Sequence, residues 1–152
     1  MNDHLVIILF VSVLVALTNI RPAYSQIALI KWHVYVKNEM SQYGPILHVH
    51  CKSKDNDLGL QNLTAGAEFE WHFKLNFTGS TLFWCYWRPE KGNIYADFKV
   101  FWKDRELFEK CNYKNCIWIA RDTGLYLRNV PKDYDEFWYH WTPGSMDTYL
   151  HP

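Results

Sequence analysis

The chain has 152 residues, with 16 basic and 16 acidic side chains and a formal net charge of zero. Nucleic acids and anionic membranes normally require a basic excess on one surface of the protein, so the neutral balance argues against both partners. The length is that of one folded domain.

The amino terminus has the features of a secretion signal. Residues 5–17 form an apolar run, shorter than the roughly 20 residues that a membrane-spanning helix needs. Ala23 and Ser25 supply the small side chains that precede a signal-peptidase cleavage site. The usual basic residue is missing from Met1 to His4, and an uncleaved anchor is the alternative. We expect residues 1–25 to be a signal peptide and the mature chain to be secreted and extracellular, with no membrane insertion after cleavage.

Apolar and polar residues alternate with a period of two along most of the remaining chain. The clearest segment is 68–75, where Phe69, Trp71, Phe73 and Leu75 share one face. This pattern predicts half-buried antiparallel strands. Other strands are expected at residues 32–36, 46–51, 96–102, 116–120, 125–127 and 136–141. Residues 82–87 are apolar on both faces, which favours a central strand, and no segment shows convincing helical periodicity.

Turn sequences separate these predicted strands. Reversals are expected at Tyr43-Gly44-Pro45, Thr78-Gly79 and Asp122-Thr123-Gly124. We therefore predict an all-β fold, a two-sheet antiparallel β-sandwich stapled by two disulfides, over residues 26–141. The prolines, glycine and polar residues of 142–152 predict a flexible C-terminal tail.

The cysteines are Cys51, Cys85, Cys111 and Cys116. In an oxidising compartment an even number predicts two disulfides, for which three pairings are possible. We expect Cys51 to pair with Cys116 and Cys85 with Cys111, because these bonds join strands that are distant in sequence. Each would stabilise the fold by about 3 to 4 kcal/mol. No Cys-x-x-Cys pair is present, which disfavours a zinc cluster.

Histidines are the first candidates for metal ligands. His48 and His50 are two residues apart and project from the same face of a predicted strand. A third ligand would have to come from His33 or His72 on a neighbouring strand. We expect these histidines to be polar residues of a partly solvated sheet face, and we expect no metal.

Motifs for catalysis or calcium binding are weak. Asp55, Asp57 and Gly59 resemble the start of a calcium loop, but the later glutamate and the flanking helices are missing. The chain has no Gly-x-Ser-x-Gly elbow, no phosphate-binding glycine loop and no cysteine left unpaired to act as a nucleophile. We expect no enzyme activity, no catalytic residues and no cofactor.

Aromatic residues make up 18% of the chain, including eight tryptophans. Most should fill the core, because burying such rings stabilises a fold by a few kcal/mol each. Trp87, Trp138 and Trp141 have a second interpretation, because together on one exposed face they would form a platform for stacking sugars.

Two sequons predict glycosylation of Asn62 and Asn76. They are Asn62-Leu63-Thr64 and Asn76-Phe77-Thr78, and the predicted strands place each in a connection that the glycosylation machinery can reach. Asn76 is the less favourable acceptor if its turn is tight.

Three motifs together point to one family. They are residues 50–59 (HCKSKDNDLG), 81–85 (TLFWC) and 111–118 (CNYKNCIW). With them the chain closely resembles the plant stigmatic self-incompatibility proteins, or S-protein homologues, over residues 32–141. The resemblance implies a β-sandwich in which the four cysteines are the framework cysteines. It also implies a small secreted protein, and characterised members are stigma-borne signals that pollen recognises.

Charged loops are the predicted recognition surface, because charges at an interface rim steer partners and exclude wrong ones. The candidate partner-binding residues are Lys54, Asp55, Asp57, Lys103, Asp104, Arg105 and Glu106. We expect a monomeric, non-enzymatic ligand for a cell-surface receptor, and reversal of Asp104 and Arg105 together should weaken recognition without unfolding the protein. The alternative is a carbohydrate-binding sandwich at the plant cell wall.

Overall fold

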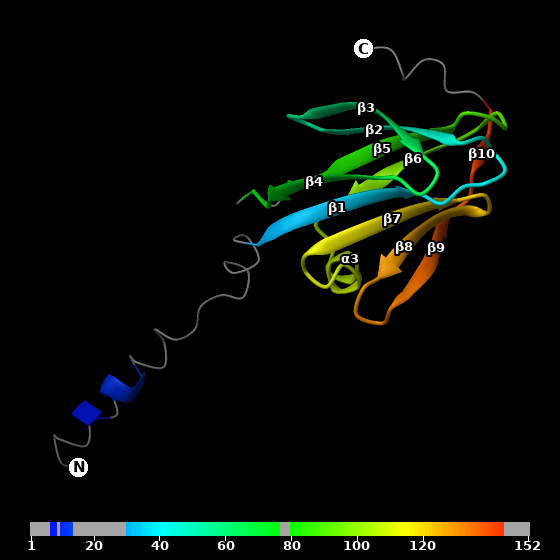
Figure 1. Cartoon of the computed structure of the whole chain (residues 1–152). Coiled ribbons are helices and arrows are strands. Elements are labelled where there is room, and N and C mark those ends of the chain that lie inside the picture. The colour runs from blue at the N-terminus through cyan, green and yellow to red at the C-terminus, as the bar shows by residue number, and fades with distance from the viewer. Residues whose placement is uncertain (1–6, 9, 14–29, 77–79, 145–152) are drawn as a thin grey trace.

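Alternating apolar side chains build two five-stranded sheets that pack face to face (Figure 1). The computed structural model describes residues 7–8, 10–13, 30–76 and 80–144. The first sheet has the strand order β4-β1-β7-β8-β9, and the second has the order β10-β6-β5-β2-β3. The strands are β1 (Lys31–Asn38), β2 (Ile46–Ser53), β3 (Asp57–Thr64), β4 (Glu68–Lys74), β5 (Phe83–Pro89), β6 (Ile94–Phe101), β7 (Asn115–Arg121), β8 (Gly124–Asn129), β9 (Tyr134–Tyr139) and β10 (Thr142–Pro143). The predicted all-β sandwich is confirmed.

The described strand pairs are antiparallel except for β1 and β7, which run parallel. The predicted turn at Asp122-Thr123-Gly124 closes the hairpin between β7 and β8, where Arg121 faces Gly124. Gly124 has a φ of +142°, and a Cβ added there would lie 2.5 Å from the Tyr139 carbonyl oxygen. Glycine is therefore required at this position. The predicted turn at Thr78-Gly79 lies outside the described residues.

The core lies between the sheets and is rich in aromatic rings. Trp32 and Trp118 of the first sheet are fully buried, as is Trp87 of the second sheet apart from 1% of its surface. The Trp118 ring nitrogen donates a hydrogen bond of 2.8 Å to the Val100 carbonyl across the core. As predicted, β5 is the central strand of its sheet.

A short helix, α3 (Arg105–Lys110), connects the two sheets and closes one end of the core. Its Leu107 is fully buried, and the Phe108 ring lies 4.5 Å from the Trp32 ring, centroid to centroid. The expectation of no helix was wrong. Six residues are too few to show a period of 3.6, although an acidic cap, Glu106 in the first turn and Lys110 in the last turn are helix signals.

Two further segments differ from the expectation. The residues of β3 were expected in a charged loop and a connection, but they form an edge strand. Only Leu63 of this strand is buried, so the strand lacks the alternation of apolar and polar residues that would have predicted it. Thr142 and Pro143 were assigned to the tail but form β10, in which Thr142 pairs with Tyr95 of β6.

The predicted cleavage site and residues 145–152 of the tail lie outside the described residues. Within the described part of the chain, no helix is long and apolar enough to cross a membrane.

The predicted presence of two disulfides is confirmed, but the predicted pairing is wrong. The bonds join Cys51 to Cys85 and Cys111 to Cys116. Cys51 and Cys85 face each other on β2 and β5 with their Cα atoms 4.1 Å apart. Cys116 lies in the other sheet, whereas Cys111 directly follows α3 and its Cα is 4.5 Å from that of Cys116. The register of β2 and β5 therefore selects the first pair, and the short connection between α3 and β7 selects the second.

Candidate functional site

Strand register brings two charged segments to the same end of the second sheet. Ser53, at the end of β2, faces Phe83 at the start of β5, and Phe83 faces Phe101 at the end of β6. The turn after β2 and the segment between β6 and α3 therefore leave the sheet at the same end, from the two strands that flank β5. We call residues 53–57 and 103–106 the charged end. It contains all seven predicted partner-binding residues.

Four of these residues are exposed to solvent without an evident structural role. Lys54 and Asp55 are exposed and form no ion pair with another described residue. The Arg105 side chain is 89% exposed and pairs with Glu109 at 2.8 Å, and the Glu106 side chain is 72% exposed and pairs with Lys110 at 3.3 Å. Exposed pairs of this kind stabilise a fold very little. These charges are therefore available to a partner.

Asp57 has a structural role within the turn. Its carboxylate lies 2.5 Å from the His50 ring nitrogen Nε2, and it accepts a hydrogen bond of 2.9 Å from the Gly59 amide. Lys52 forms an ion pair with it at 3.1 Å. The hydrogen bond with His50, followed by that from Gly59, holds the pKa of Asp57 well below its usual value, and Lys52 adds to this effect. The exposed Asp57 carboxylate is thus engaged by neighbouring groups of its own turn.

Asp104 is likewise held by the fold. It is the N-cap of α3, and its Oδ1 accepts a hydrogen bond of 2.8 Å from the Leu107 amide. Side-chain acceptors at this position satisfy backbone donors that have no partner within the helix. Lys103 beside it is exposed. The predicted residues therefore lie together, but they differ in role. Asp57 and Asp104 stabilise the fold, whereas the exposed charges described above can contact a partner.

A hollow of about 260 Å³ lies beside the charged end. The turn after β2, the end of β4 and the segment before β5 line it. Lys54, Asp55 and Lys74 place charges around it, and Phe73 and Leu82 supply apolar contacts. Sequence reasoning missed Lys74, whose position at a predicted strand end was the available signal.

The tryptophans do not form the platform that sugar stacking requires. All eight lie in described residues, and none is exposed. Trp87 is buried, the Trp138 ring packs 5.4 Å from Trp118, and the Trp141 ring nitrogen donates to the Arg121 carbonyl at 2.8 Å. The observation on which the carbohydrate-binding alternative depended is therefore missing from the structure.

The predicted histidine neighbours lie on different sheets. His48 and His50 are on β2, where His48 contacts Asn62 of β3. His33 and His72 are on β1 and β4 of the first sheet and face each other. Neither can supply the third ligand considered for the pair on β2.

Comparisons with known proteins agree with this architecture. Residues 33–141 match the family described as plant self-incompatibility protein S1. S-protein homolog 74 of Arabidopsis thaliana is 44% identical over 114 residues, which cover 75% of this chain and 74% of the relative. S-protein homolog 1 of the same plant is 42% identical, with the same coverage.

A solved structure shows the same fold. It is described as that of SPH (self-incompatibility protein homologue) proteins, a widespread family of small, highly stable, secreted proteins from plants. It matches with a TM-score of 0.57 and 21% identity, and the match covers 74% of this chain and 95% of the other. At this identity the likeness concerns the fold.

Proposed function

This chain belongs to the plant self-incompatibility protein S1 family, and from that premise we propose that it is a secreted, extracellular, non-enzymatic ligand. A cell-surface receptor protein recognises it through the charged end. The predicted signal peptide at residues 1–25 supports secretion, as does the description of the SPH relatives as secreted proteins. The observation that carries the proposal is the gathering of exposed charges from two distant segments at one end of the sandwich.

A rigid framework that displays variable loops is a common arrangement for recognition. Here Cys51–Cys85 links β2 to β5, and Cys51 lies near the end of β2, just before the turn that carries Lys54 and Asp55. The second bond, Cys111–Cys116, links the end of α3 to β7. Both charged segments are thus anchored by a disulfide within a few residues. A receptor would meet them in a nearly fixed arrangement, which reduces the entropy lost on binding.

The charges at this end suit selective association. Lys54 and Arg105 are positive, and Asp55 and Glu106 are negative, so these four exposed side chains carry both signs and together have no net charge. Such a pattern attracts only a partner with the complementary pattern and repels others. We expect salt to weaken the association, because exposed charges are screened over about 8 to 10 Å at physiological ionic strength.

The chemistry of the charged end supports binding more than catalysis. Asp57, with its lowered pKa, stays ionised and accepts hydrogen bonds within its own turn. Asp104 is used as a helix cap. All four cysteines are in disulfides. These groups are thus committed to the fold rather than arranged as a nucleophile with a neighbouring base.

A charge-swap variant tests the proposal. The substitutions Lys54→Glu, Asp55→Lys, Arg105→Glu and Glu106→Lys reverse four exposed charges and preserve the net charge. Asp57 and Asp104 stay unchanged, so the turn and the helix cap are retained. The matched control exchanges Lys37 and Glu68, an exposed ion pair at 3.3 Å on the first sheet.

Binding of the labelled mature chain to the surfaces of pollen tubes and leaf protoplasts is then measured at increasing salt concentration. We expect saturable, salt-sensitive binding that is at least about tenfold weaker for the charge-swap variant and unchanged for the control. Denaturation curves establish that both variants are folded. Saturable binding that the folded charge-swap variant retains, or the lack of saturable binding to either cell type, would overturn the proposal.

A further inference from the structure

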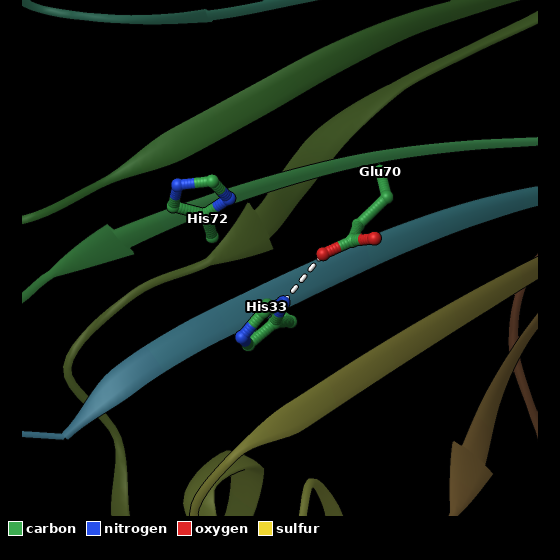
Figure 2. Close-up of side chains that lie close together, drawn as sticks. All are labelled: His33, Glu70 and His72. Carbon is green, nitrogen blue, oxygen red and sulfur yellow. Dashed lines mark hydrogen bonds and ion pairs between the residues drawn. The ribbon is translucent and has the colours of Figure 1, made fainter.

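Two histidines and a glutamate meet on the outer face of the first sheet. Figure 2 shows His33 of β1 beside Glu70 and His72 of β4, with the three side chains gathered over the two strands. One potential ligand atom from each residue lies within 4.8 Å of the others. We propose that His33, Glu70 and His72 bind one divalent metal ion of the zinc type. The inference does not depend on the proposed ligand role.

The strand register explains why these residues meet. His33 and His72 are directly opposite each other on the antiparallel strands β1 and β4, and Glu70 faces Tyr35. Cβ atoms of such opposite residues are about 4.5 to 5.5 Å apart. Trp32 and Val34 point into the core, so alternation directs His33 outward. Glu70 and His72 are two residues apart and share that outer face.

Neighbouring rings and the fixed backbone of β1 restrict the His33 side chain. Its ring stacks on Tyr35 with a centroid distance of 6.2 Å and lies 5.7 Å from the His72 ring. Strand β1 is flanked by β4 and β7, which holds its backbone by hydrogen bonds on both edges. One ligand is therefore positioned before any ion binds. Glu70 and His72 are exposed and can adjust to the ion.

The donor set is one that zinc prefers. Two imidazole nitrogens and one carboxylate oxygen are the protein ligands of many zinc sites with an open fourth position. Bonds of about 2.0 to 2.2 Å place ligand atoms roughly 3.4 Å apart in a tetrahedral site. The observed limit of 4.8 Å thus requires only small rotations of the exposed side chains. Magnesium and calcium prefer oxygen ligands, so we expect selectivity against both.

The hydrogen bond between His33 and Glu70 orients this pair without metal. The Nδ1 atom of His33 and the Oε1 atom of Glu70 are its two partners. Metal binding through Nδ1 requires the tautomer that carries the ring proton on Nε2, and Nδ1 and Oε1 then become ligands. His72 supplies the third bond through one ring nitrogen. The fourth position is open to water or to a donor from another molecule.

Zinc titration of the purified, tag-free mature chain tests the proposal. Isothermal calorimetry should show one zinc ion per chain, and magnesium should give no binding at the same concentrations. The NMR signals of the His33 and His72 rings should shift with zinc, whereas those of His48 and His140 should not. His48 contacts Asn62 on the other sheet, and the His140 ring contacts Phe137, so both are remote references.

Single substitutions identify the ligands. His33→Ala, Glu70→Gln and His72→Ala should each weaken zinc binding by at least about tenfold. His48→Ala and His140→Ala are matched controls that should retain it, and circular dichroism verifies that each variant is folded. A folded chain that binds no zinc would overturn the proposal, as would unchanged affinity in His72→Ala. The charge-swap variant keeps all three ligands, so failure of either proposal leaves the other standing.

Discussion

The Oδ1 atom of Asp104 accepts a hydrogen bond of 2.8 Å from the backbone nitrogen of Leu107. This bond caps α3, whose Leu107 and Phe108 close one end of the core. Asp104 was predicted to contact a partner, and the structure gives it a role in the fold. Reversing Asp104 and Arg105 together would therefore combine a loss of stability with any loss of recognition.

Replacing the cap should lower stability. We expect Asp104→Ala to reduce the free energy of unfolding by about 1 kcal/mol, whereas Asp104→Asn, which retains an acceptor, should change it by only a few tenths. Urea denaturation followed by tryptophan fluorescence measures both. Arg105→Ala is the control, because its side chain is 89% exposed and such changes stay within about 0.5 kcal/mol. Equal stability of the Ala and Asn variants would refute the capping role.

The two disulfides should differ in their contribution to stability. Cys51–Cys85 closes a loop with a sequence separation of 34, and Cys111–Cys116 one with a separation of 5. Loop-closure entropy predicts a loss of about 4 kcal/mol for removing the first bond and about 2 kcal/mol for the second. Double Cys→Ala variants test this order. Peptide mapping without reduction should identify both pairs, and a peptide joining Cys51 to Cys116 would contradict the structure.

Stability should fall at acidic pH, in part through Glu136. Burial alone would raise the pKa of Glu136, but hydrogen bonds from Lys110, Tyr134 and Asn129 outweigh it and hold the pKa at about 2, below the ordinary value of 4.5. A carboxylate with a lowered pKa in the folded state stabilises the fold above its unfolded pKa. This contribution is complete above about pH 4.5 and is lost as the pH falls toward 2.

The pH dependence of Glu136→Gln tests this assignment. We expect the variant to be less stable by about 1 to 3 kcal/mol at pH 7, because the half-buried Lys110 loses a charged partner. Its stability should also fall less between pH 5 and pH 2 than that of the unsubstituted chain. Glu109→Gln, which alters an exposed carboxylate on α3, is the control. Parallel pH curves for Glu136→Gln and the unsubstituted chain would rule out the role of Glu136.

Glycosylation should favour Asn62 over Asn76. Asn62 is exposed on the edge strand β3, and its Oδ1 contacts His48 at 2.6 Å, which leaves the amide nitrogen for a glycan. The amide nitrogen of Asn76 donates to the Ser80 hydroxyl at 2.7 Å, so a glycan would replace this bond. Protein secreted from plant cells should migrate faster on a gel after deglycosylation.

Removing the Asn62 sequon should abolish most of that shift. Thr64→Ala is suited to this test, because it deletes the sequon and keeps the contact between Asn62 and His48. Thr78→Ala removes the second sequon in the same way and should have the smaller effect. An unchanged mass after enzymatic deglycosylation of the secreted chain would show that neither asparagine is modified.

Most strands could be predicted because their signal is local. Side chains of one strand alternate between core and solvent, and residues 68–75 show this within the segment itself. Strand β3 escaped prediction because an edge strand with one buried residue, Leu63, does not need that alternation. Helix α3 is too short for a period to be visible, so its capping residues were the only local signal.

The sequence by itself determined the fold class, the position of most strands, the family and the charged segments, because each depends on neighbouring residues or short motifs. Only the tertiary structure decided that Cys51 bonds to Cys85, that the two charged segments share one end, and that His33 meets His72. These relationships depend on the register between strands that are far apart in the chain. That register is set by packing both sheets around one core, which no local pattern of residues encodes.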